Sequence, residues 1–109
     1  MTVLEMSNKL SLNTVSIPCG DREVSGVYIG DLLSWVMGRA ESGDAWITIM
    51  SNINVVAVAS LADVACIVLA EGVVLPEDVK ATAIQKEINV LSSPKTAYEL
   101  AIAIGGLMK

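Results

Sequence analysis

Residues 46–70 read WITIMSNINVVAVASLADVACIVLA, and this stretch decides the fold. Trp46 to Met50 and Cys66 to Ala70 are short apolar runs typical of buried strands. The segment between them, Asn52 to Val64, has two interpretations, because its valines favour a strand while its alanines and Leu61 favour a helix. A helix capped by Asn52 suits the spacing between two parallel strands, so we expect a strand–helix–strand unit.

Similar elements precede and follow this unit. Thr2 and Glu5 match a capping box at the start of a helix over Val3 to Leu10. We expect strands over 13–17, 24–29 and 88–91, and helices over 32–40 (capped by Asp31), 77–86 and 95–108. The order α-β-β-α-β-α-β-α-β-α, without repeats or linkers, predicts a single domain over residues 1–109. Its expected fold class is α/β: a three-layer α/β/α arrangement with a largely parallel sheet of about five strands and helices on both faces. The residues expected to be buried are Val15, Ile17, Ile47, Ile67, Val68, Leu69, Val90 and Leu91.

Composition narrows the classes of function. Hydrophobic residues make up 53% of the 109 residues and none is Phe, so the core must be aliphatic, which suits a parallel sheet covered by helices. The net charge of −5, with scattered Lys and Arg, predicts no nucleic-acid partner and no anionic membrane surface. No apolar run is long enough to span a bilayer and no secretory signal is recognisable, so we expect a cytoplasmic protein. Two distant cysteines and no histidine predict free thiols, no metal site and no cofactor.

Polar segments follow each expected strand. Ligands of open α/β sheets bind beyond the carboxyl ends of the strands, so we expect Cys19–Glu23, Gly30–Asp31, Ser51–Asn54, Glu71–Gly72 and Ser92–Ser93 to gather at one edge. The alternative is that these residues only form turns and helix caps. Strand direction is inferred here, so a segment can also fall at the opposite edge.

Arg22 has two interpretations. A guanidinium beside a helix start is a sensible anion site, whereas an Asp–Arg pair or a bond to a backbone carbonyl makes Arg22 structural. Catalytic sets are missing: a chain without His has no Ser-His-Asp or Cys-His arrangement, and neither GxxxxGK[ST] nor GxGxxG occurs. Asp21 with Asp31 is a weak candidate for an acid–base pair. We therefore expect no enzyme.

One stretch resembles a known family. Residues 21–33, DREVSGVYIGDLL, resemble the D-R-x-V-[ST]-G-x-Y-x-G-D-L-L pattern of short bacterial DRTGG domains. The resemblance continues through 44–48, 54–61 and 88–94. This chain departs from the family at Val27, where many members carry a second Gly, and at Ser51–Asn54, where a Thr-His-x-Asn-like turn is expected. The candidate ligand-binding residues are Asp21, Arg22, Ser25, Gly26, Tyr28, Gly30, Asp31, Asn52, Asn54, Glu71, Gly72, Ser92 and Ser93.

The family implies a regulatory part rather than a catalyst. DRTGG domains occur within CBS-domain pyrophosphatases and some phosphotransacetylases, and their fold is similar to the N-terminal domain of HPr kinase/phosphorylase. The kinase activity there belongs to a separate P-loop domain, and no P-loop occurs in this chain. We expect a non-catalytic regulatory or interaction module that homodimerises and binds a small anionic ligand. The alternative is a structural adaptor for a larger redox (hydrogenase-associated) or kinase partner, since short members often accompany iron hydrogenase genes.

Overall fold

The computed structural model describes residues 1–108 and confirms the expected α/β class. One five-stranded sheet has the order β1-β5-β4-β3-β2. Strands β2 to β5 run parallel, and β1 pairs with β5 in the antiparallel direction. The elements are α1 (Val3–Leu10), β1 (Asn13–Ser16), β2 (Gly26–Ile29), α2 (Leu33–Arg39), β3 (Asp44–Thr48), α3 (Ile53–Ala62), β4 (Cys66–Leu69), α4 (Glu77–Gln85), β5 (Val90–Ser92) and α5 (Ala97–Leu107).

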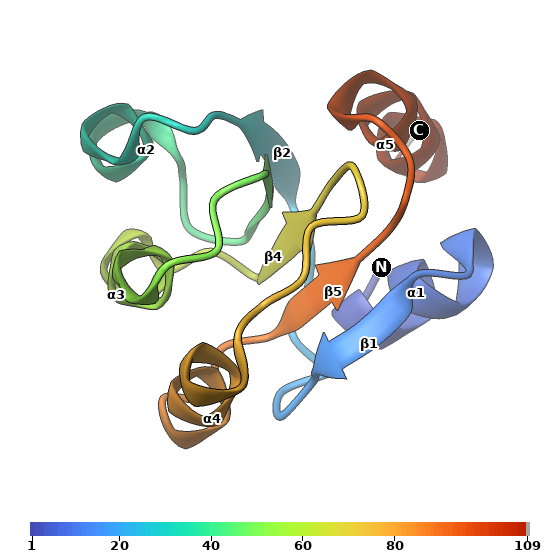
Figure 1. Ribbon diagram of the computed structural model, residues 1–109. Coiled ribbons are helices and arrows are strands. Elements are labelled where there is room, and N and C mark those ends of the chain that lie inside the picture. Colours follow the sequence, from blue (N-terminus) through green and yellow to red (C-terminus); the bar gives the residue numbers. More distant parts are fainter. Residues whose placement is uncertain (109) are drawn as a thin grey trace.

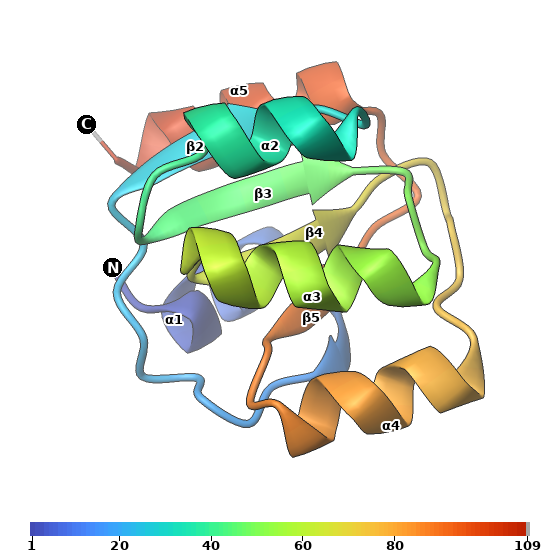
Figure 2. The ribbon, with the colours of Figure 1, turned by 90° about the vertical axis from the view of Figure 1, so that its left-hand side faces the viewer.

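The helices form two layers on opposite faces of the sheet. Figure 1 shows α2, α3 and α4 on one side of the strands and α1 and α5 on the other. From the side, α2, α3 and α4 lie next to one another in front of the sheet (Figure 2). The strand order explains why α2, α3 and α4 share a face. Each connection from β2 through β5 leads to the neighbouring strand in the same direction across the sheet. Because such crossovers are right-handed, their helices lie on the same face.

Each layer encloses its own apolar core. One core contains Trp46, Ile67 and Leu69 with side chains of α2, α3 and α4, and the other contains Ile47, Val68 and Leu91 with side chains of α1 and α5. Alternate residues of a strand point to opposite faces, which explains how β3 and β4 supply both cores and are buried throughout.

The expected burial is confirmed for six of the eight residues, namely Ile47, Ile67, Val68, Leu69, Val90 and Leu91. Val15 and Ile17 are only partly buried. Val15 lies on β1, an edge strand, and Ile17 follows its last residue, so neither has a strand on each side.

Local capping explains where the helices begin. The Thr2–Glu5 capping box is present, and the Asn52 side chain accepts the Asn54 amide proton, which confirms the helical interpretation of the central segment. The last helix begins at Ala97 rather than Lys95. Its N-cap is Thr96, which forms a second capping box with Glu99.

Candidate functional site

The candidate residues are divided between the two edges of the sheet. Because β2 to β5 are parallel, their carboxyl ends share one edge, where Gly30, Asp31, Asn52, Asn54, Glu71, Gly72, Ser92 and Ser93 lie, with Tyr28 near the end of β2. Strand β1 runs the other way, so the loop after it, with Asp21 and Arg22, reaches the amino edge together with Ser25 and Gly26. The expectation of a single edge was therefore wrong for residues 19–23. Asp21 and Asp31 lie at opposite edges and form no acid–base pair.

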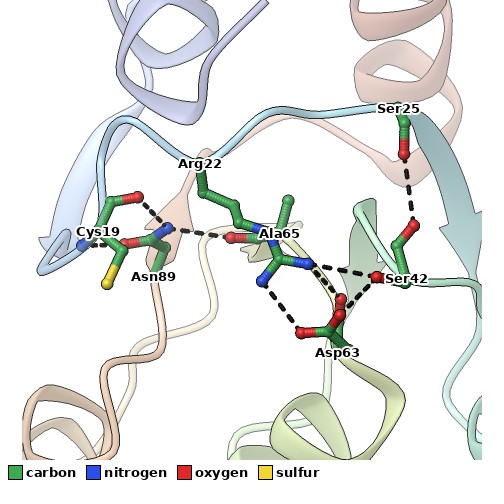
Figure 3. Close-up of polar contacts among 7 residues, drawn as sticks. All are labelled: Cys19, Arg22, Ser25, Ser42, Asp63, Ala65 and Asn89. Carbon is green, nitrogen blue, oxygen red and sulfur yellow. Dashed lines mark hydrogen bonds and ion pairs between the residues drawn. The ribbon is translucent and has the colours of Figure 1, made fainter.

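At the amino edge, Arg22 ties its loop to the end of α3. Its guanidinium donates from Nη1 to Asp63 Oδ1 at 3.1 Å and from Nη2 to the Asp63 carbonyl oxygen at 2.8 Å (Figure 3). Asp63 ends α3 in the left-handed conformation, φ 58°, where Asp is one of the better-tolerated residues. The carbonyl at a helix C-terminus carries partial negative charge, so the guanidinium is well placed there.

The hydroxyl of Ser42 completes this contact. It donates to Asp63 Oδ2 and accepts a long bond from Arg22 Nη2, 3.5 Å. The Ser42 and Arg22 hydrogen bonds, in that order, lower the pKa of the Asp63 carboxyl below its ordinary value of 3.8. The carboxylate and the guanidinium therefore neutralise each other, and Arg22 is not left free for an anion.

Ser25 and Gly26 have structural roles at the same edge. Ser25 Oγ donates to the Ser42 carbonyl oxygen at 3.3 Å (Figure 3). A Cβ atom at position 26 would collide with the Asp44 carboxylate, so a larger residue at the start of β2 would require that side chain to shift. Arg22, Ser25 and Gly26 therefore fasten the loop between β1 and β2 to the rest of the domain.

Asn89 contributes to the same edge and was missed at the sequence level. The side chain is buried; Oδ1 accepts from Cys19 N at 2.9 Å, and Nδ2 donates to the carbonyls of Cys19 at 2.8 Å and Ala65 at 3.0 Å (Figure 3). The sequence did contain a signal, a single amide side chain within an apolar, strand-like run. A buried polar group of this kind needs hydrogen-bond partners. A pocket of about 230 Å³ lies here between Arg22, Asp63, Lys86 and Asn89. Three of these four side chains already hold protein partners, so little remains for a ligand.

At the carboxyl edge, Asp31 is not the expected helix cap. Helix α2 begins at Leu33 after Leu32, which makes no side-chain capping bond. The Asp31 carboxylate instead accepts from Thr48 Oγ1 at 2.8 Å and from Ile49 N at 3.0 Å. Gly30 accepts from Trp46 Nε1 at 2.9 Å. Both residues join the end of β2 to β3.

The turn after β4 is also held by backbone bonds. Glu71 and Gly72 adopt positive φ, 60° and 72°. Their amides donate to Lys95 O at 2.8 Å and Ser93 O at 3.0 Å. These bonds join the turn after β4 to the one after β5. The turn-forming interpretation therefore holds for Glu71 and Gly72, and the capping interpretation holds for Asn52.

One groove at this edge remains available. It encloses about 410 Å³, within the range of small-molecule sites, between β1, the 72–75 segment, the start of α4 and the end of β5. Its apolar side comes mainly from Val73, Val74 and Leu75. Within residues 1–108, the Asn13, Thr14, Ser92 and Lys80 side chains that line it form no hydrogen bond or ion pair. Of the predicted residues, Gly72, Ser92 and Ser93 line this groove; Lys80 and the β1 residues were not predicted.

The position of this groove follows from the topology. Strands β4 and β5 are neighbours, yet the chain leaves β4 toward α4 on one face and leaves β5 toward α5 on the other (Figure 1). Loops that diverge in this way open a crevice at the carboxyl edge, which is where open α/β sheets bind ligands. No other pair of adjacent parallel strands in the described part of the chain sends its following helices to opposite faces.

Comparison with known proteins extends only to the fold. No family model matches the chain, and no curated protein matches it. The structure is similar to the crystal structure of the CBS and DRTGG domains of the regulatory region of Clostridium perfringens pyrophosphatase complexed with an activator, diadenosine tetraphosphate. The TM-score is 0.73 at 14% identity, over 94% of this chain and 45% of that chain. The molecule therefore has a DRTGG-like α/β fold and spans less than half the length of that regulatory region.

Residues 1–108 contain neither a membrane-spanning helix nor a cluster of metal ligands. None of the helices within 1–108 combines the length and apolar character needed to cross a membrane. The same residues contain no group of three or more Cys, Asp or Glu side chains arranged to hold a metal ion.

Proposed function

We propose that residues 1–109 form a single DRTGG domain that acts in the cytoplasm as a non-catalytic regulatory module, homodimerising and binding a small anionic ligand. The motif at 21–33 and the DRTGG-like fold support the family assignment. The neighbour is the regulatory region of an enzyme rather than its catalytic part, which supports a regulatory role.

The groove at the carboxyl edge carries the ligand-binding part of this proposal. It lies where α/β sheets bind ligands. Within residues 1–108 its Asn13, Thr14, Lys80 and Ser92 side chains have no protein partner, unlike Arg22 at the amino edge. A ligand that pairs with Asn13, Thr14 and Ser92 would satisfy groups otherwise left to water.

Lys80 specifies the charge of the ligand. It is the cation among the groove residues and lies one helical turn after Glu77, which lines the same groove. An anionic group must therefore bind near Lys80 and away from Glu77, with the rest of the ligand against Val73 to Leu75. Nucleotides and phosphorylated metabolites have this combination, and the structural neighbour was crystallised with a nucleotide activator.

The test is a thermal-shift screen of nucleotides and phosphorylated metabolites against the whole chain. A ligand at about 100 times its Kd adds roughly 2.7 kcal/mol of stability, enough to raise Tm measurably. Lys80→Ala should abolish the shift, whereas Lys9→Ala, which removes an exposed lysine from α1 on the other face, should retain it. A panel without any shift, or a shift that Lys80→Ala retains, would contradict the site.

A structural adaptor for a larger redox (hydrogenase-associated) or kinase partner is the second candidate. The exposed, uncharged face of α3 favours it, because Ile53, Ala57 and Leu61 recur every four residues there and are all exposed. An adaptor should bind such a partner with unchanged affinity in Lys80→Ala and show no shift with any small ligand.

A further inference from the structure

Strand β2 forms one edge of the sheet and is open on its outer side. It pairs with β3 along one side, and within residues 1–108 no other strand pairs with it. Its residues are partly buried or exposed, whereas those of β3 are all buried. The outer side of β2 thus presents backbone amides and carbonyls that can pair with another strand.

The two edge strands differ in how they are protected. Strand β1 is polar, Asn-Thr-Val-Ser, has an irregular register between Thr14 and Ser16, and is followed two residues later by Pro18. Polar residues, bulges and prolines discourage pairing with other chains. Strand β2 reads Gly-Val-Tyr-Ile, with no charge, no proline and no bulge. The open side of β2 therefore lacks the features that keep β1 unpaired.

Exposed apolar side chains lie on β2 and on the helices next to it. Ile29, the last residue of β2, is 48% exposed. The helices α2 and α5 lie on opposite faces of the sheet next to β2 (Figure 1), and α5 contacts β2 directly. Leu32 and Trp35 are exposed at the start of α2, as are Tyr98 and Ile102 on α5. Both helices beside β2 therefore carry exposed apolar side chains that a partner with its own helix layers could cover.

Charge and symmetry favour a second copy of this chain as the partner. Two chains of net charge −5 repel each other, so they must meet where carboxylates are few. Residues 26–29 contain none. When two copies of one strand pair antiparallel about a two-fold axis, the amides of each copy face the carbonyls of the other. One surface therefore complements itself.

The area that a dimer requires agrees with this choice. A standard interface takes roughly 600–1,000 Å² from each partner, between about a tenth and a fifth of the 5541 Å² surface of this chain. Four edge residues alone would not supply that area. The exposed side chains of α2 and α5 supply the remainder only if the partner also has helices on both faces of its sheet, as a second copy does.

We propose that two copies pair antiparallel through β2, so that one sheet runs through both molecules and α2 and α5 pack beside their copies. The inference rests on the homodimer included in the proposed function and names its surface. It is independent of the ligand groove, which lies beside β1 and α4 at the other side of the sheet.

The test combines oligomeric state with hydrogen exchange. Light scattering of the whole chain across the micromolar range should report twice the 11.5 kDa chain mass. Ile29→Lys puts a lysine on the β2 edge, and natural edge strands use lysine to prevent pairing. This variant should therefore be a monomer. Leu61→Lys makes the same change at a side chain 72% exposed on α3, a helix that packs between α2 and α4, and should remain dimeric. The amides of residues 26–29 should become more protected from exchange as the protein concentration rises.

Other outcomes separate the proposals. A wild-type monomer across this range, or a dimer that survives Ile29→Lys but not Leu61→Lys, would overturn pairing through β2. If the Ile29→Lys variant does not fold, Ile102→Lys on α5 is the second variant, and it is also expected to abolish the dimer. Exchange at 26–29 that does not depend on concentration would also overturn it. Ligand-induced thermal shifts are scored separately, so failure of the groove leaves this result interpretable.

Discussion

Replacing Arg22 by alanine distinguishes the two interpretations of that residue, a structural contact and an anion site. The guanidinium donates two hydrogen bonds of 3.1 and 2.8 Å to Asp63, which lies 41 residues further along the chain. Hydrogen bonds to charged groups contribute about 1.5–3 kcal/mol when sheltered from water. The Arg22 and Asp63 side chains are 35% and 60% exposed, which reduces the ion-pair part to the roughly 0.2–1 kcal/mol of surface pairs.

The bond to the Asp63 carbonyl adds to that value, but its loss leaves no unsatisfied acceptor. Gly43 N also donates to this carbonyl, at 2.9 Å. We therefore expect Arg22→Ala to lower the free energy of unfolding by about 1–2 kcal/mol, the sum of one exposed ion pair and one ordinary hydrogen bond. In a domain of this size that loss lowers Tm by about 4–8 °C. Lysine keeps the positive charge but lacks the forked pair of donors of the guanidinium. Arg22→Lys should therefore lower the free energy of unfolding by about half as much.

The assay is urea unfolding of three proteins: wild type, Arg22→Ala and Arg39→Ala. Arg39 is the other arginine of the chain; its guanidinium stacks over the Trp35 ring at 3.7 Å from the centroid, on an exposed helix face. The stacking contributes about 0.5–1 kcal/mol at such a site, so Arg39→Ala should cost less than Arg22→Ala. In a double-mutant cycle with Asp63→Asn, coupling of about 0.5–1 kcal/mol is expected. Equal stability of wild type and Arg22→Ala, with a lost ligand response, would refute the structural role.

The pKa of Asp63 is lowered in the folded state, first by the Ser42 hydrogen bond, so its stabilisation is present above pH 3.8 and lost as the pH falls through the lowered value. The unfolding free energies of wild type and Ser42→Ala should therefore converge in acid; a gap that stays constant with pH would contradict this. Burial raises the pKa of the Cys66 thiol to about 12, so a thiol reagent at pH 8 should label partly exposed Cys19 in the native protein and Cys66 only after unfolding. Equal labelling rates before unfolding would show that Cys66 is accessible.

Local sequence patterns predicted most of the fold because the elements are locally encoded. The capping signals of Thr2 and Asn52 placed two helices, and apolar runs placed β3 and β4 within two residues of their observed bounds. The predictions were wrong where one side chain could either cap a helix or bond to another part of the fold. Asp31 is a favourable cap by residue type, but its carboxylate is taken by Thr48 and Ile49 of the neighbouring strand segment. Tertiary partners of this kind leave no trace in a local pattern.

The direction of β1 was the decisive unknown for the site. It is fixed by pairing with β5, Asn13 with Ser92, across most of the chain, and periodicity contains no information about such distant contacts. A single antiparallel strand moved Arg22 from the expected ligand edge to the opposite one. The Arg22–Asp63 contact was likewise out of reach, although an Asp at the end of an apolar helix is itself a signal for a left-handed C-cap.

Because the candidate residues lie at two edges of the sheet, the DRTGG-like motif has a structural role in this chain. At the amino edge, Arg22, Asp63 and Asn89 are engaged with protein groups, so their chemistry goes into holding the β1–β2 loop. At the carboxyl edge, Lys80 and Ser92 face a groove without such partners in the described residues. A ligand gains most where polar groups are otherwise left to water, because it displaces no existing bond. The motif residues thus build the scaffold, and binding is expected at residues outside the motif.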